Sequence, residues 1–141
     1  MQIKDLMTKD VSSVKRNSTL QDAAKIMKDL NVGSIPVCDG KQAVGIITDR
    51  DIAIRNVANA GMTNTPVEQV MSTNLISGHP QMSDQEAARL MAENQIRRLP
   101  IMENKEIVGI VSLGDLAVQS ASDMEAGEAL SSISYPSKPA K

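Results

Sequence analysis

Two short segments of the chain carry residue types suited to binding a nucleotide, and both follow one pattern. A glycine, two aliphatic residues, a hydroxyl residue, two variable residues and an aspartate give Gly45, Thr48 and Asp51, then Gly109, Ser112 and Asp115. A hydroxyl group at the start of a helix can accept from free amides or donate to a phosphate oxygen. A carboxylate can accept from both hydroxyls of a ribose, and a strand glycine permits close approach of a ligand or another backbone.

The same residues also have a purely structural interpretation. Thr48 and Ser112 are ordinary helix N-cap residues, and Asp51 and Asp115 fall in the first helical turn, where acidic side chains are favoured. Recurrence of the pattern at the same point of two repeats favours the functional interpretation, and the sequence leaves both open.

The chain consists of two copies of one plan, offset by 64 residues. The gapless superposition gives 13 identities across positions 7–58, whereas random pairing would give about three. Other pairs keep their chemistry, such as Asp22 with Glu86. The two copies therefore share one fold, and the two patterns occupy equivalent positions in it.

Each copy is expected to fold as β-α-β-β-α, which places the chain in the α/β class, of the α+β kind. Thr19 and Ser83, each with an acidic residue three positions later, begin the first helix of each copy. The expected apolar faces of these helices are Leu20, Ala23, Ala24, Met27 and Leu30, and Ala87, Ala88, Leu90 and Met91.

A hairpin and a second helix complete each copy. The strands are expected at 34–38 and 43–48, and at 98–102 and 107–112, with second helices at 49–58 and 113–120. Short extended segments precede the first helices near 12–14 and 75–77. Each pattern thus lies where a strand runs into a helix.

The expected domain boundaries follow from the repeat. Residues 1–61 form the first repeat, 62–66 the linker, 67–120 the second repeat and 121–141 a tail. Thr65 and Pro66 are expected to be the N-cap and first residue of a helical turn through Val70. The tail is expected to form a weak helix over 123–133 and then to fray.

Composition argues against several classes of protein. One Tyr, no Trp or Phe and a net charge of −2 provide neither the aromatic platforms nor the basic groove of a nucleic-acid-binding protein. One cysteine excludes a disulfide scaffold within the chain. The longest apolar run is five residues and the N-terminus is charged, so we expect neither a membrane helix nor a signal peptide, and a cytoplasmic location.

The residues most often used in catalysis and metal binding offer no constellation. His79 is the lone histidine, next to a proline, and is expected on the surface, with no second metal ligand near it in sequence. Cys38 lies in an apolar strand and is expected to be a small buried hydrophobe, with a redox switch as the alternative. No nucleophile with an adjacent base can be assembled, so we expect no enzyme and no required cofactor.

The repeat, its Ile35-Pro36-Val37 and Leu99-Pro100-Ile101 strands and the two patterns resemble a tandem pair of cystathionine-β-synthase (CBS) domains, the Bateman module, over residues 3–120. The resemblance implies a non-catalytic regulatory module whose two copies pack with pseudo-two-fold symmetry. Adenosine-containing ligands (AMP, ADP, ATP or S-adenosylmethionine) would bind in the clefts between the copies, and two modules would join as a homodimer.

The resemblance also implies roles for individual residues. Asp51 and Asp115 would hold riboses, while Thr48 and Ser112 would contact the first phosphate. Around the Asp115 cleft the other copy would contribute Thr19, Ala24, Val32 and Gly33. Around the Asp51 cleft it would contribute Ser83, Ala88, Ile96 and Arg97, and Arg97 and Arg98 would point toward phosphates.

Differences between the copies predict unequal sites. Gly33 and Ser34 of the first copy correspond to Arg97 and Arg98 of the second. We therefore hypothesise that the cleft with Ser112 and Asp115, flanked by Arg98, binds nucleotide better; the alternative is that the two arginines are solvated strand-end charges. Two functions remain open: a sensor that regulates a protein target, or an assembly module that dimerises with weak or no nucleotide binding.

Overall fold

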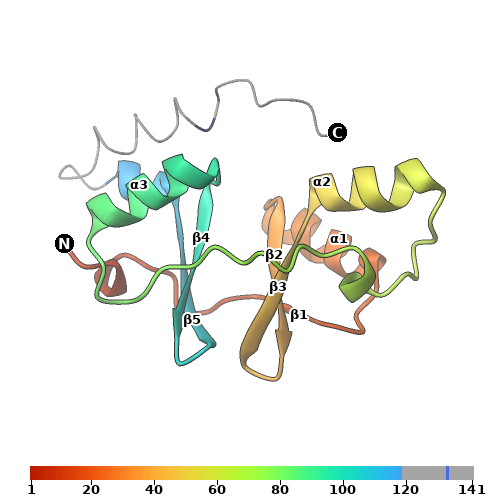
Figure 1. Cartoon of the computed structure of the whole chain (residues 1–141), viewed down its shortest axis with the longest axis horizontal. Coiled ribbons are helices and arrows are strands. Elements are labelled where there is room, and N and C mark those ends of the chain that lie inside the picture. The colour runs from red at the N-terminus through yellow and green to blue at the C-terminus, as the bar shows by residue number, and fades with distance from the viewer. Residues whose placement is uncertain (119–132, 134–141) are drawn as a thin grey trace. The chain divides into compact units, whose positions relative to one another are not determined.

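The computed structural model describes residues 1–118 and residue 133, and has the mixed α+β fold expected from the repeat (Figure 1). The chain divides into two compact units. The first-repeat unit contains residues 10–75 and 104–107, and the second-repeat unit contains residues 1–9, 76–103 and those from 108 onward.

The first-repeat unit holds a small sheet and its flanking helices. Its elements are β1 (Val14–Lys15), α1 (Leu20–Leu30), β2 (Ser34–Asp39), β3 (Gln42–Thr48), α2 (Asp49–Asp51), the π-helical turn η2 (Ile52–Asn56), and the 3-10 turns η3 (Val57–Asn59) and η4 (Val67–Gln69). β1 runs parallel to β2, and β2 pairs antiparallel with β3. The hairpin was expected almost residue for residue.

The second-repeat unit repeats this plan with fewer regular elements. Its elements are η1 (Ile3–Asp5), α3 (Asp84–Asn94), β4 (Arg98–Glu103), β5 (Glu106–Ser112) and α4 (Leu113–Ala117). The turn between β4 and β5 belongs to the first-repeat unit, where Glu106 pairs with Gln42. The strand order is therefore β1-β2-β3-β5-β4.

The two long helices begin at the predicted caps. Thr19 and Asp22 form a complete capping box at α1, whereas Ser83 accepts from the Glu86 amide without the reciprocal bond. Both helices end in left-handed residues, Asn31 and Gln95, with φ of 55° and 53°. These ends turn the chain directly into β2 and β4.

The expected apolar face of α1 was too wide. Leu20, Ala23 and Met27 are buried, but Ala24 is exposed and Leu30 is 51% exposed. Ala24 lies four residues after Leu20 and Leu30 lies three after Met27, so both stay on the same side of the helix but at the two edges of its buried stripe. On α3 the expected residues are buried except Leu90, which is half-buried.

Each unit has its own apolar core between its helices and strands. In the second-repeat unit Leu99 and Ile101 of β4, Val111 of β5 and Leu116 of α4 have no exposed surface. In the first-repeat unit Ile35, Val37 and Ile47 lie against the buried residues of α1. Burial of these apolar side chains is the main favourable term in the folding of each unit.

The segments that lead into each repeat are exchanged between the units. η1 lies at the start of the first repeat but packs in the second-repeat unit, where the Ile3 amide donates to Met82 O (2.9 Å). η4 lies at the start of the second repeat but packs in the first-repeat unit, where the Val67 amide donates to Ser18 O (2.8 Å). The expected turn begins one residue late: Pro66 is its cap, while the Thr65 hydroxyl donates to Met62 O.

Two further expectations need correction. The helix expected over 49–58 is broken into α2, η2 and η3, and α4 ends at Ala117. Asn56 lies buried at the end of η2, donating to Met62 O and accepting from the Gly61 amide through its own carbonyl. In the second repeat, residues 75–77 belong to no strand; Gly78 makes a single parallel bridge to Ile101.

The pattern glycines make room for the exchanged segments. A Cβ on Gly45 would lie 2.7 Å from Ser72 O, which accepts from the Ile46 amide (2.9 Å), while the Ser72 amide donates to Ile46 O (2.9 Å). A Cβ on Gly109 would instead meet the flexible side chain of Met7, whose sulfur would be 2.4 Å away. The sequence allowed two roles for these glycines, close approach of a ligand or of another backbone. The structure fits the second, because another segment of the chain packs against each of them.

Gly45→Ala should therefore destabilise the protein more than Gly109→Ala. The first substitution must move paired backbone, with an expected loss of about 1–3 kcal/mol, whereas Met7 can change rotamer. Urea denaturation measures both, and Gly114→Ala, where a Cβ would meet nothing closer than Ser112 Oγ at 3.7 Å, is the control. A larger loss in Gly109→Ala would contradict this account of the glycines.

The expected tail helix over 123–133 lies outside the described residues, apart from Ile133, which packs against the core of the second-repeat unit. Over the part of the chain that the structure describes, no helix has the length and apolar character needed to cross a membrane.

Candidate functional site

The first pattern forms a capping box at the junction of β3 and α2. The Thr48 amide donates to Asp51 Oδ2 (3.1 Å), and the Asp51 amide donates to Thr48 Oγ1 (2.9 Å). Both side chains are half-buried. The structural interpretation of these residues is therefore correct, and it leaves the hydroxyl hydrogen of Thr48 able to donate to a ligand.

The second pattern has the same geometry at the junction of β5 and α4. The Ser112 amide donates to Asp115 Oδ2 (2.9 Å), and the Asp115 amide donates to Ser112 Oγ (3.0 Å). Among the residues that the structure describes, Asp115 Oδ1 has no hydrogen-bond or ion-pair partner. One carboxylate oxygen is therefore free to accept from a ligand hydroxyl.

The residue before each hairpin lies against the pattern of its own unit. The Asp49 amide donates to Gly33 O (2.9 Å), and the Leu113 amide donates to Arg97 O (2.8 Å). A Cβ on Gly33 would lie 3.1 Å from the Asp49 carboxylate. Arg97 is exposed and corresponds to Gly33. The second-repeat unit therefore carries a cation at a position where the first-repeat unit has no side chain.

Arg98 adds a buried donor to the second-repeat unit. Its side-chain Nε is buried and, within the described part of the chain, has no hydrogen-bond partner. A buried donor without an acceptor is costly. An acceptor brought by a ligand would relieve that cost, whereas a fully solvated Arg98 would not leave its Nε buried.

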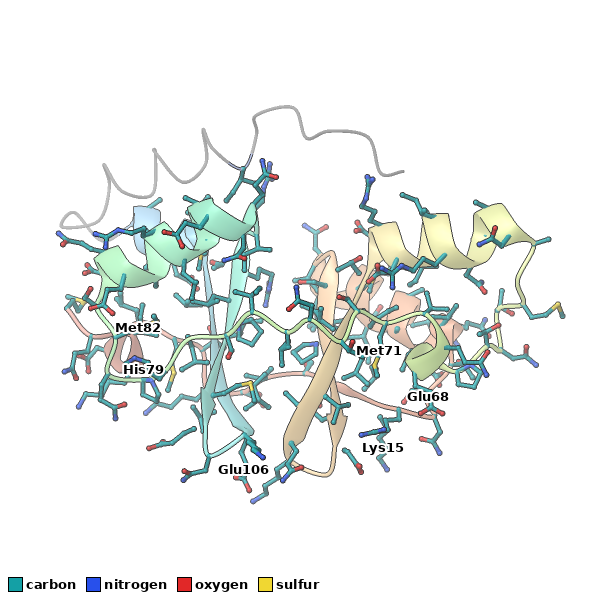
Figure 2. All side chains as sticks on the ribbon, in the orientation of Figure 1. Lys15, Glu68, Met71, His79, Met82 and Glu106 are labelled. Atoms are coloured by element: carbon teal, nitrogen blue, oxygen red, sulfur yellow. The ribbon has the colours of Figure 1, made fainter. Side chains whose placement is uncertain are left out.

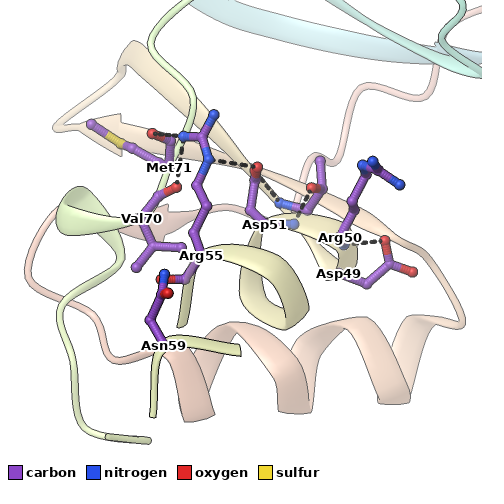
Figure 3. A network of polar contacts seen from close by, with 8 residues as sticks. Asp49, Arg50, Asp51, Arg55, Asn59, Val70 and Met71 are labelled. Atoms are coloured by element: carbon purple, nitrogen blue, oxygen red, sulfur yellow. Dashed lines mark hydrogen bonds and ion pairs between the residues drawn. The ribbon is translucent and has the colours of Figure 1, made fainter. Parts of the chain in front are cut away.

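Arg55 distinguishes the two patterns, and sequence reasoning missed it. Its Nε lies 3.7 Å from Asp51 Oδ1, and its Nη1 donates to Val70 O (3.3 Å) and Met71 O (3.4 Å) (Figure 3). Asp51 is 13% exposed, while Arg55 is 55% exposed. The i, i+4 spacing of acid and base in a predicted helix was the signal that could have found the pair.

The remaining predicted site residues are divided between the units. Thr19, Ala24 and Val32 lie at the start, on the exposed side and just past the end of α1. Ser83, Ala88 and Ile96 hold the corresponding places around α3, where Ala88 is only 1% exposed. Their predicted role in lining clefts with the other repeat stays a prediction.

His79 and Cys38, the residue types most often used in metal and thiol chemistry, lie in different surroundings. Within residues 1–118 and 133, no three His, Cys, Asp or Glu side chains gather as a metal-binding group, and His79 is exposed (Figure 2). Cys38 is 4% exposed in β2, so the expectation of a small buried hydrophobe is confirmed. Burial raises the pKa of the Cys38 thiol above its ordinary 9.0, although a hydrogen bond with Ser13 lowers it in part.

The raised pKa of Cys38 predicts how stability depends on pH. The folded state holds the thiol proton more tightly than the unfolded state, so the stabilising contribution is complete below pH 9.0 and is lost as the pH rises toward the folded pKa. Urea denaturation between neutral and alkaline pH should show this decline, and Cys38→Ala should lessen it. An alkaline dependence unchanged in Cys38→Ala would contradict the assignment.

Comparison with known proteins identifies the fold family. A model described as CBS domain matches residues 3–56 and again 67–121. The CBS domain-containing protein YhcV of Bacillus subtilis is 52% identical over 133 residues, which are 94% of this chain and 95% of that protein.

Two solved structures have the same fold. Hypoxic Response Protein I, solved with two coordinated zinc ions, superposes with a TM-score of 0.78 at 31% identity, over 84% of this chain and 98% of that one. The CBS domain pair of MJ0100, in complex with 5′-methylthioadenosine and S-adenosyl-L-methionine, has a TM-score of 0.75 at 27% identity, over 87% and 98%. The chain therefore belongs to the CBS domain family and carries two copies of the domain.

Proposed function

We propose that the chain is a non-catalytic sensor that binds an adenosine-containing ligand and regulates a protein target. The observation that carries the proposal is the second-repeat half-site, which we define as Ser112, Asp115, Arg97 and Arg98. It combines a hydroxyl, a carboxylate with one free oxygen and a buried unpaired guanidinium nitrogen among the described residues. These groups suit a phosphate, a ribose and a second anionic contact.

The ligand chemistry follows from the same groups. A ribose supplies two hydroxyl donors that a carboxylate oxygen can accept, and a phosphate or carboxylate supplies the acceptor that Arg98 lacks. The aliphatic residues predicted to surround the base fit a chain with one aromatic residue. The complex of the MJ0100 domain pair with S-adenosyl-L-methionine supports adenosine as the shared part of the ligand.

Thermal melting in the presence of candidate ligands tests the proposal. AMP, ADP, ATP and S-adenosylmethionine at about 1 mM should raise the melting temperature if the dissociation constant lies well below that concentration. Cytidine monophosphate, which has the ribose and phosphate but a different base, is the control. No shift with any adenosine ligand, or an equal shift with the control, would contradict an adenosine-specific site.

Assembly is the second candidate function, and three exposed apolar side chains close together in the sequence favour it. Ile54, Val57 and Met62 follow one another through η2, η3 and the segment after them, with exposures of 49%, 66% and 68%. Large exposed apolar side chains near one another often mark an interaction surface. A homodimer formed through this surface would be visible by sedimentation velocity, and a monomer at high concentration would remove the support for assembly.

A further inference from the structure

We propose that Arg55 weakens ribose binding at the first-repeat half-site, defined as Thr48 and Asp51, because it competes with the ribose for the Asp51 carboxylate. The inference rests on the proposed function, because it concerns the same ligand chemistry at the first repeat. It starts from a polar network around Asp51 that has no counterpart around Asp115 among the residues that the structure describes (Figure 3).

Both carboxylate oxygens of Asp51 are engaged within its own unit. Oδ2 accepts from the Thr48 amide at 3.1 Å, and Oδ1 lies 3.7 Å from the Arg55 Nε. A ribose hydroxyl that approaches this carboxylate must therefore compete with a guanidinium. The equivalent oxygen of Asp115 has no such competitor among the described residues.

Arg55 is held at Asp51 by more than the ion pair. Its Nη1 donates to the carbonyls of Val70 and Met71, in the segment that follows η4. Three contacts on one planar guanidinium fix its orientation better than a single charge contact would. Displacing Arg55 also frees two carbonyls, so ribose binding at Asp51 carries an added cost.

The sequence of the other repeat supplies the matched substitution. The residue 64 positions after Arg55 is Gln119, which carries no charge. Arg55→Gln thus gives the first pattern the side chain of the second. Arg55→Lys keeps the positive charge but lacks the planar guanidinium. Comparing it with Arg55→Gln therefore distinguishes the contribution of the ion pair from that of the hydrogen bonds to Val70 O and Met71 O.

Isothermal titration with adenosine provides the test, because adenosine carries a ribose but no phosphate that Arg55 could attract. The first-repeat half-site is isolated by Asp115→Asn. In that background Arg55→Gln should tighten adenosine binding by about two- to fivefold, the range set by an exposed ion pair, and Arg55→Lys should give a smaller gain. Arg50→Gln, at an exposed neighbour whose backbone alone contacts Asp49, should have no effect.

The outcomes separate this inference from the proposed function. If the wild-type chain binds an adenosine ligand but Arg55→Gln leaves adenosine affinity in the Asp115→Asn background unchanged or weaker, the role of Arg55 is wrong and the sensor remains. If the wild-type chain binds none of the adenosine ligands, the proposed function itself fails. If Arg50→Gln tightened adenosine binding as much as Arg55→Gln, the effect would come from the loss of any nearby positive charge. That result would overturn the inference.

Discussion

Asp115→Asn should weaken binding of an adenosine ligand by about ten- to a hundredfold, because charged hydrogen bonds to the ribose are worth about 1.5–3 kcal/mol. Asparagine keeps the size of the side chain and an oxygen that can accept from the Ser112 amide, so the start of α4 should persist. Isothermal titration of the wild-type and variant proteins with the same nucleotide measures the loss.

Asp51→Asn is the matched control for this substitution. It changes the same residue type in the same capping box, but in a carboxylate already engaged by Arg55. Its effect on affinity should therefore be several-fold smaller. Equal losses in the two variants would contradict the unequal sites that the sequence predicted, and a larger loss in Asp51→Asn would reverse their order.

Leu99→Ala should lower the free energy of unfolding by about 2–5 kcal/mol, the range for removing a buried leucine side chain. Leu99 has no exposed surface and lies in β4 within the core of the second-repeat unit. The substitution leaves a cavity among close-packed neighbours that can only partly collapse. Calorimetry and urea denaturation followed by circular dichroism measure the loss.

Leu30→Ala makes the same chemical change at an exposed position. Leu30 is the last residue of α1 and is 51% exposed, so its loss should change stability by about 0.5 kcal/mol or less. Because each unit has its own core, Leu99→Ala should act on the transition of the second-repeat unit if two transitions are resolved. Similar effects of the two substitutions would contradict the assigned core.

The repeat made most of the fold predictable from the sequence. Beta-branched residues, turn residues and the repeat located both hairpins to within one residue, and a hydroxyl residue caps each helix as expected (Thr19, Ser83, Thr48 and Ser112). These signals are local, since a cap or a turn depends on a few adjacent residues. The family assignment followed from their recurrence in register.

The features that sequence reasoning missed depend on contacts between distant segments. The exchange of η1 and η4 between the units leaves no periodic signal, and the need for Gly45 is set by Ser72, far along the chain. The π-helical turn η2 ends at Asn56, which packs against Gly61, where even a Cβ would meet Asn56 Oδ1 at 2.0 Å. Tertiary packing decides such details, not local propensity.

The candidate site was predictable in its residues but not in its asymmetry. The two patterns were found from spacing alone, and their hydroxyl residues are the expected N-caps, each completed into a capping box by the aspartate. The contact of Arg55 with Asp51, Val70 and Met71 requires the helix after β3 to lie beside the segment after η4, which no spacing specifies. The composition indicated a weak absorbance of the chain itself, with one Tyr and no Trp.

Equilibrium dialysis of the full chain against AMP, ATP and S-adenosylmethionine, read at the adenine absorption band, tests the central claim most directly. The low absorbance of the chain lets bound adenine be measured without labelling. The account predicts an excess of at least one of these ligands on the protein side, reduced in Asp115→Asn. No excess of any of them at ligand concentrations of about 1 mM would contradict the claim that this pair of CBS domains is an adenosine-ligand sensor.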